Sequence, residues 1–153
     1  MSFRFEIIPF IGYQDGRASS LKKHFNAKSV TVIEVYTVDK DFDNTQKRQI
    51  LKYFEKPFYP KLVLDGASYP KFEYAVEIGF LPVVTDNVGN TAKEIIQDAL
   101  MTRFNEEEAV YSSVLYLVSG IKDVQRFAES LYNPLIQYLK IKKYNEFIKD
   151  GGM

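Results

Sequence analysis

The chain has 153 residues, of which 46% are hydrophobic and 15% aromatic, so it is long and apolar enough to bury the core of one compact unit. Twenty Lys and Arg side chains balance twenty Asp and Glu side chains, and a zero net charge disfavours nucleic acid or acidic lipid as a partner. Cysteine is absent, which excludes disulfides, thiolate metal sites and a cysteine nucleophile, and fits a reducing compartment. We therefore expect a cytoplasmic protein.

Histidine occurs once, at His24, so a metal site built on paired histidines cannot form within one chain. No residue near His24 has the spacing of a catalytic partner, and we expect a surface or boundary histidine. We expect no metal and no cofactor. The chain also lacks an apolar run long enough for a signal peptide or a membrane span.

The first half alternates strand and helix patterns. Phe3, Phe5 and Ile7 alternate with polar residues, as in a strand with one buried face. Segment 29–38 is dominated by β-branched and aromatic residues and is the clearest strand of this half. The expected order is a strand at 2–7, a helix from Ala18, a strand at 29–38, a helix capped by Asp43 or Asn44, and a strand at 62–64 before an Asp65–Gly66 turn.

The second half repeats this order. Apolar residues fall at helical spacing between Ala92 and Leu100, which predicts the clearest amphipathic helix of the chain. The expected elements are a strand at 72–78, a helix capped by Thr85, Asp86 or Asn87, a strand at 110–118, a helix at 124–131 and an apolar segment at 135–141.

Particular residues recur as well. Glu6-Ile7 matches Glu77-Ile78 at an offset of 77 − 6 = 71. Tyr36 matches Tyr116 at 116 − 36 = 80, and Leu62 matches Leu139 at 139 − 62 = 77. We interpret these matches as an internal duplication, because one small α/β unit leaves an apolar face that needs a partner.

The predicted fold class is α/β, an α+β sandwich of two tandem βαββαβ-like halves with mainly antiparallel sheets. We expect the halves to pack through their sheets as an intramolecular pseudo-dimer. The expected division is 1–66 for the first repeat, 67–144 for the second and 145–153 for a flexible exit or linker. Such an exit suggests a domain taken from a longer protein.

The segment from Ala75 to Asn90, AVEIGFLPVVTDNVGN, resembles the small-subunit family of phosphoribosylformylglycinamidine synthase (FGAM synthase), the glutamine-dependent enzyme of purine biosynthesis. The matching features are an apolar strand, a turn with proline, an Asp at the helix start and a Gly one turn later. The whole chain resembles the duplicated form at the N-terminus of long synthases. The first copy departs from the pattern, with Asp15-Gly16-Arg17 in place of Asp86-Asn87-Val88-Gly89.

The resemblance implies a structural domain without an active site of its own, part of an ATP- and glutamine-dependent ligase. Its partners would be the synthase and glutaminase parts of the same enzyme, held so that ammonia passes between them. The missing cysteine agrees independently, because a glutaminase needs an activated one. A homodimer of the isolated chain is left open.

The candidate site residues are Thr85, Asp86, Asn87 and Gly89, as a helix cap or a docking loop for those partners. The charge clusters, Glu106–Glu108 and the lysines at 140, 142 and 143, are typical of solvated loops or strand edges, with electrostatic docking as the alternative.

Two other functions compete with the scaffold. One is a regulatory domain that binds an amino acid between the copies, with the Asp15-Gly16 and Asp86–Gly89 turns holding the zwitterion. The other is an independent enzyme. A ligand-induced rise in melting temperature would favour the regulatory domain.

Overall fold

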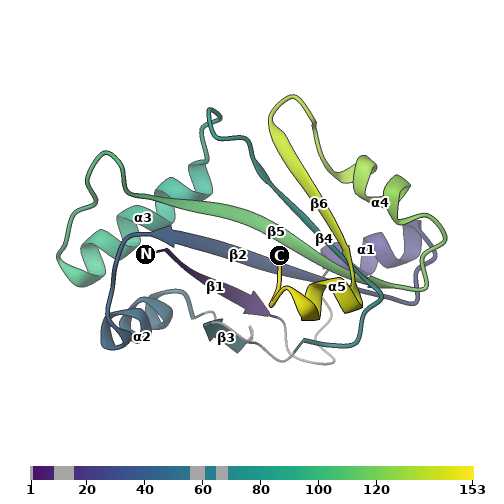
Figure 1. The fold of residues 1–153 in the computed structure, drawn as a ribbon, viewed down its shortest axis with the longest axis horizontal. Coiled ribbons are helices and arrows are strands. Elements are labelled where there is room, and N and C mark those ends of the chain that lie inside the picture. Colours follow the sequence, from purple (N-terminus) through teal and green to yellow (C-terminus); the bar gives the residue numbers. More distant parts are fainter. Residues whose placement is uncertain (1, 9–15, 56–60, 65–68) are drawn as a thin grey trace.

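A computed structural model describes residues 2–8, 16–55, 61–64 and 69–153, with only the backbone of 61–64. The elements in chain order (Figure 1) are β1 (Phe3–Ile8), α1 (Gly16–His24), β2 (Ser29–Asp39), α2 (Asn44–Tyr53), β3 (Lys61–Leu64), β4 (Tyr74–Phe80), α3 (Asn87–Leu100), β5 (Ala109–Ser119), α4 (Val124–Leu131), β6 (Gln137–Lys143) and α5 (Tyr144–Lys149). Asp43, not Asn44, caps α2, and its side chain forms a capping box with Gln46. The expected Asp65–Gly66 turn and Asp15 lie outside the described residues.

Six strands form one sheet in the order β3-β1-β2-β5-β4-β6, and all neighbours run antiparallel. The first half of the chain supplies one side of the sheet and the second half the other. In the middle, β2 and β5 have eleven residues each and pair along their whole length. The α/β class with antiparallel pairing is therefore confirmed.

Two details of the expected fold are wrong. The halves join edge to edge instead of stacking sheet on sheet, because the long edges of β2 and β5 satisfy each other's backbone N–H and C=O groups. Each half has the order βαβαβ, not βαββαβ, because a single long strand fills the stretch between its two helices.

The pairing register reproduces the offsets seen in the sequence. Glu6 lies opposite Val35 on β2 and Val63 on β3. Glu77 lies opposite Leu115 on β5 and Lys140 on β6. The differences 77 − 6, 115 − 35 and 140 − 63 are 71, 80 and 77. Matching residues thus occupy matching places in one sheet, while their origin by duplication stays a prediction.

Helices α1 to α4 pack on one face of the sheet in two pairs (Figure 1). At one end, α2 and α3 cover the aromatic side chains of β1 and β2, with Ile50 and Ile96 fully buried. At the other end, α1 and α4 cover β4 and β5, with Phe127 and Ala128 fully buried. Burial of these apolar stripes is the main force that fixes the helices on the sheet.

Helix α5 lies on the opposite face, where a flexible exit was expected for 145–153. Its Phe147 is 1% exposed and packs edge-on against Tyr69 and Phe72, with ring centroids 5.2 Å away in both cases. The expectation is therefore wrong for 145–149, which lie in a helix. Burial of Phe147, the ring contact of Tyr144 with Phe72 and the ion pair of Lys142 with Asp150 hold this end of the chain on the sheet.

Candidate functional site

The candidate loop of Thr85, Asp86, Asn87 and Gly89 connects β4 to α3. Asp86 is the N-cap of α3: its Oδ1 accepts the N–H of Gly89 at 2.8 Å and the hydroxyl of Ser112 at 2.7 Å. Its Oδ2 accepts the N–H of Ser112 at 2.6 Å. One buried carboxylate therefore ties the start of α3 to β5.

Gly89 has a packing role in the same joint. A Cβ at this position would collide with the carbonyl oxygen of Val110 and with the Asp86 side chain. The helix can approach β5 this closely only because residue 89 is glycine. Thr85 and Asn87 are exposed and leave the docking role of the loop as a prediction.

A notch opens in the sheet beside this loop. Strand β5 begins at Ala109, but it pairs with β4 only from Ser113, which lies opposite Gly79. The stretch of β5 that lacks a β4 partner, 109–112, borders a cavity of about 520 Å³, which we call the notch. Its polar lining includes Thr37, Thr85, Tyr111, Ser113, Tyr138 and Lys140.

Tyr138 and Lys140 form the β6 side of the notch. The ring of Tyr138 lies across Gly79, where any Cβ would collide with it. Lys140 Nζ is 5.4 Å from the centroid of that ring, within the range of a cation–π contact. Burial, followed by the charge of Glu77, raises the pKa of Tyr138, so this phenol stays neutral at pH 7.

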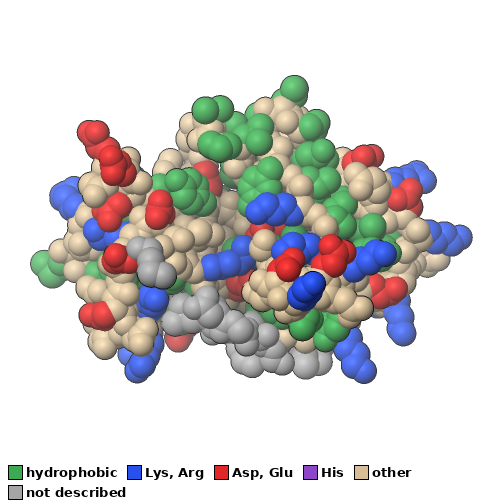
Figure 2. Space-filling view, in the orientation of Figure 1, with side chains coloured by type: hydrophobic (Ala, Val, Ile, Leu, Met, Phe, Trp, Pro, Cys, Tyr) green, Lys and Arg blue, Asp and Glu red, His purple; other side chains and the backbone are tan. Residues whose placement is uncertain are grey.

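The rim of the notch is apolar. The backbone N–H of Leu81 donates to the carbonyl of Ile136 at 2.9 Å, which joins the β4–α3 loop to the α4–β6 loop. Val83 is 96% exposed and Leu135 is 83% exposed at the tips of these loops. Figure 2 shows hydrophobic side chains gathered there, at the top of the view, on the face that carries α5.

A buried ionic cluster lies on the same face. Arg4 on β1 bridges two glutamates, with Nε 3.1 Å from Glu6 Oε1 and Nη2 2.7 Å from Glu77 Oε1. Tyr69 donates to Glu6 at 2.6 Å, and Ser113 donates to Glu77 at 3.0 Å. The two carboxylates come from matching positions of the two halves, so one guanidinium links β1 to β4 across the central strands.

The cluster stabilises charge and leaves neither carboxylate as a free base. Burial lowers the pKa of Arg4, but the attraction of Glu77 and Glu6 outweighs burial, and the net shift is upward. Burial and the hydrogen bond to Glu6 raise the pKa of Tyr69, which therefore remains a donor. The arrangement is that of an internal tie between the halves.

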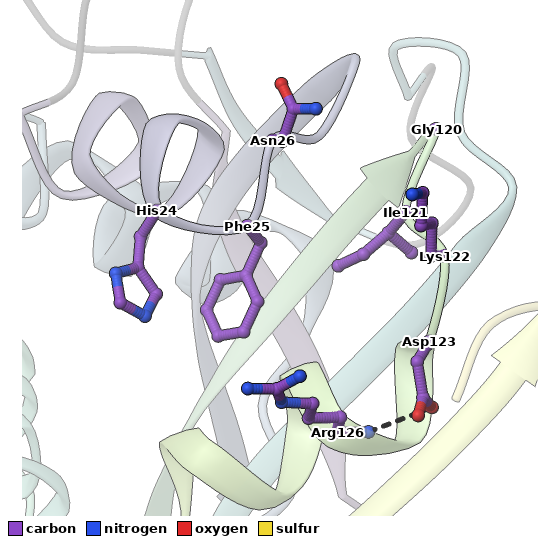
Figure 3. A pocket seen from close by; sticks show the side chains of 8 residues that line it. All are labelled: His24, Phe25, Asn26, Gly120, Ile121, Lys122, Asp123 and Arg126. Carbon is purple, nitrogen blue, oxygen red and sulfur yellow. Dashed lines mark hydrogen bonds between the residues drawn. The ribbon is translucent and has the colours of Figure 1, made fainter.

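A second cavity, of about 360 Å³, contains His24 and lies between the end of α1 and the β5–α4 loop (Figure 3). His24 is exposed, as expected, and its ring makes a T-shaped contact with Phe25, with the ring centroids 4.8 Å apart. The carboxylate of Asp123 accepts the backbone N–H of Arg126 at 3.2 Å as the N-cap of α4. The acid in this cavity is thus used in capping, and no base–acid pair is assembled around His24 there.

Among the described residues, no group of three His, Asp or Glu side chains could hold a metal ion. None of the described helices has the length and apolar character needed to cross a membrane. No protein-family model matches the sequence, and no curated protein matches it either.

The sequence patterns did not predict the ionic cluster of Arg4, Glu6 and Glu77. The two glutamates recur between the halves, and as charged residues inside apolar strands they also indicate buried ion pairs. Lys140 was assigned to a solvated edge, and β6 is indeed an edge strand. Its position in the lining of the notch depends on the pairing of β6 with β4, which sets Lys140 opposite Glu77 and which no local pattern encodes.

Proposed function

We propose that this chain is a non-catalytic assembly domain of phosphoribosylformylglycinamidine synthase. In this role it organises the ATP-dependent synthase and the glutaminase in the cytoplasm, so that ammonia passes between them. The segment Ala75–Asn90 carries the resemblance to the small-subunit family. The function rests on surfaces that fix other domains in register and lower the entropic cost of joining two active sites.

The mirrored register of the sheet is the observation that carries this proposal. Matching residues of the two halves have matching neighbours, and the halves meet through the antiparallel β2–β5 pair. Two fused copies of a small subunit would produce this arrangement, with each copy completing the sheet of the other. Fusion would also fix the two copies at a constant stoichiometry.

The buried acids of the described residues support a structural role. Glu6 and Glu77 share Arg4, and Asp86 is occupied by Gly89 and Ser112. A general base needs a free lone pair directed at a substrate, whereas the oxygens of these carboxylates accept hydrogen bonds and ion pairs from within the protein. Asp86, the acid among the candidate site residues, therefore has a structural role.

The test reconstitutes a synthase body and a glutaminase with and without the chain. We expect the chain to co-purify with both and to raise glutamine-dependent product formation, while formation from added ammonium changes little. We expect this difference between the glutamine-dependent and the ammonium-dependent activity because assembly affects ammonia transfer and not the synthase chemistry. Equal effects on both activities, or no complex, would contradict the proposal, as would turnover of a metabolite by the chain alone.

The amino-acid regulatory domain remains the second candidate, because the notch is a cavity of ligand size. A zwitterion needs an acceptor for its ammonium group. The carboxylate that lines the notch, Asp86, already accepts three hydrogen bonds. The notch therefore fits a plain anion better than an amino acid.

A further inference from the structure

We propose that the notch between β4, β5 and β6 binds a small organic carboxylate that carries an apolar group. Lys140 would pair with the carboxylate, and the apolar wall of the cavity would hold the rest of the ligand. The inference stands apart from the assembly role, since a scaffold needs no small-molecule site.

The described lining of the notch contains one cation, Lys140, and one carboxylate, Asp86. No carboxylate of the described residues is within ion-pair distance of Lys140, and its contact is the neutral ring of Tyr138. Glu77 lies opposite Lys140 in the β4–β6 register, but Arg4 and Ser113 hold its carboxylate. Asp86 already accepts three hydrogen bonds from Gly89 and Ser112. Lys140 is therefore available to an external anion.

Hydroxyl groups line the same cavity. Thr37 and Tyr111 lie opposite each other in the β2–β5 pair, and Thr85 lines the cavity from the loop between β4 and α3. Within the part of the chain that the structure describes, these three side chains make no hydrogen bond to protein. Each can donate a hydrogen bond to a polar group of a ligand in the cavity.

The remaining wall is apolar and the cavity has a suitable size. Phe80, Leu81, Pro82 and Val84 line it on the loop side. A volume of about 520 Å³ falls within the range of small-molecule pockets, roughly 300–1,000 Å³. An aromatic or aliphatic group beside the carboxylate would displace water from these side chains.

The test titrates the full chain with hippurate and with its uncharged analogue hippuramide, following backbone amide signals by NMR. We expect saturable shifts at Thr37, Thr85 and Tyr111, with hippurate binding about fivefold tighter than the amide, as one partly exposed ion pair provides. The difference should shrink in high salt, since salt screens exposed charges.

Two lysine variants serve as a matched pair. Lys140→Gln should remove the preference for hippurate over hippuramide, while Lys143→Gln, on the same edge strand, should keep it. Unchanged melting temperatures would show that both variants fold. An equal preference in Lys140→Gln and the parent chain would overturn the proposal, as would shifts centred on α5 or on the His24 cavity. Tighter binding of phenylalanine than of hippurate would also overturn it, in favour of amino-acid recognition.

Discussion

Glu34 on β2 lies directly opposite Val114 on β5. Val114 is also the residue that corresponds to Glu34 in the second half, at the offset of 80 residues (114 − 34). A residue can face its counterpart only at the centre of a two-fold arrangement. The pairs on either side mirror each other, from Ser29 with Ser119 to Asp39 with Ala109. The centre of the β2–β5 pair is thus also the centre of the mirrored register.

Introducing a second acid at this centre should destabilise the fold. In Val114→Glu two carboxylates would face each other, and we expect a loss of about 1 kcal/mol relative to Val114→Gln, which has nearly the same shape without the charge. Urea unfolding of both variants at pH 7 measures this difference. The difference in unfolding free energy between the two variants should narrow at high salt, because salt screens the repulsion. Equal stabilities at pH 7 would show that these positions are not close neighbours.

The ionic cluster departs from the two-fold arrangement. At the offset of 71, the counterpart of Arg4 is Ala75 (75 − 4), which is fully buried beneath α5. An arginine there would leave no room for the packing of Phe72 and Phe147. One guanidinium therefore serves the two equivalent glutamates, Glu6 and Glu77.

Removal of this shared cation should be costly. Arg4→Met would leave two buried carboxylates without a counter-charge, and we expect a loss of about 3 kcal/mol in the free energy of unfolding. The triple variant Arg4→Met/Glu6→Gln/Glu77→Gln should recover most of it, because neutral amides tolerate burial better. Arg103→Met, at an exposed arginine, is the matched control and should change stability by less than about 0.5 kcal/mol. A loss of equal size in both single variants would contradict the shared tie.

Two glycines should respond oppositely to alanine. Gly89→Ala would force a methyl group into the Val110 carbonyl, and we expect a loss of about 1–3 kcal/mol, because backbone must move. Gly16→Ala meets no atom within 4 Å and should be neutral or stabilising by up to about 1 kcal/mol. Thermal unfolding of the two variants distinguishes them. A neutral Gly89→Ala would mean that α3 does not approach β5 as described.

Alkaline pH should destabilise the chain through its buried tyrosines. Burial, with the charges of Glu34 and Asp86, raises the pKa of Tyr36 to about 12. Because the pKa of Tyr36 is higher in the folded chain than in the unfolded chain, protonated Tyr36 contributes its full stabilisation below pH 10. This contribution to the unfolding free energy is lost as pH rises towards 12. Tyr36→Phe should therefore flatten the fall in unfolding free energy between pH 10 and 12 by roughly 1–3 kcal/mol. Tyr53→Phe, at an exposed tyrosine, should leave the slope unchanged.

Local patterns were enough to predict most elements and the caps. The alternation of Phe3, Phe5 and Ile7 and the helical spacing from Ala92 to Leu100 are interactions between near neighbours, which act on any chain with that pattern. The Asp86 cap depends on an N–H only three residues away. The three sequence offsets are likewise those of the sheet register, because matching strands keep matching neighbours.

Tertiary structure alone decided how these elements combine. The edge-to-edge joining of the halves, the burial of Phe147 and the sharing of Arg4 all depend on residues brought together from distant parts of the chain. The notch exists because β4 stops pairing with β5 at Gly79 and Ser113, while β5 stays paired with β2 as far as Ala109. Lys140 lines it from β6. Such contacts are selected by burial and charge compensation in the folded molecule, and no pattern of nearby residues carries that information.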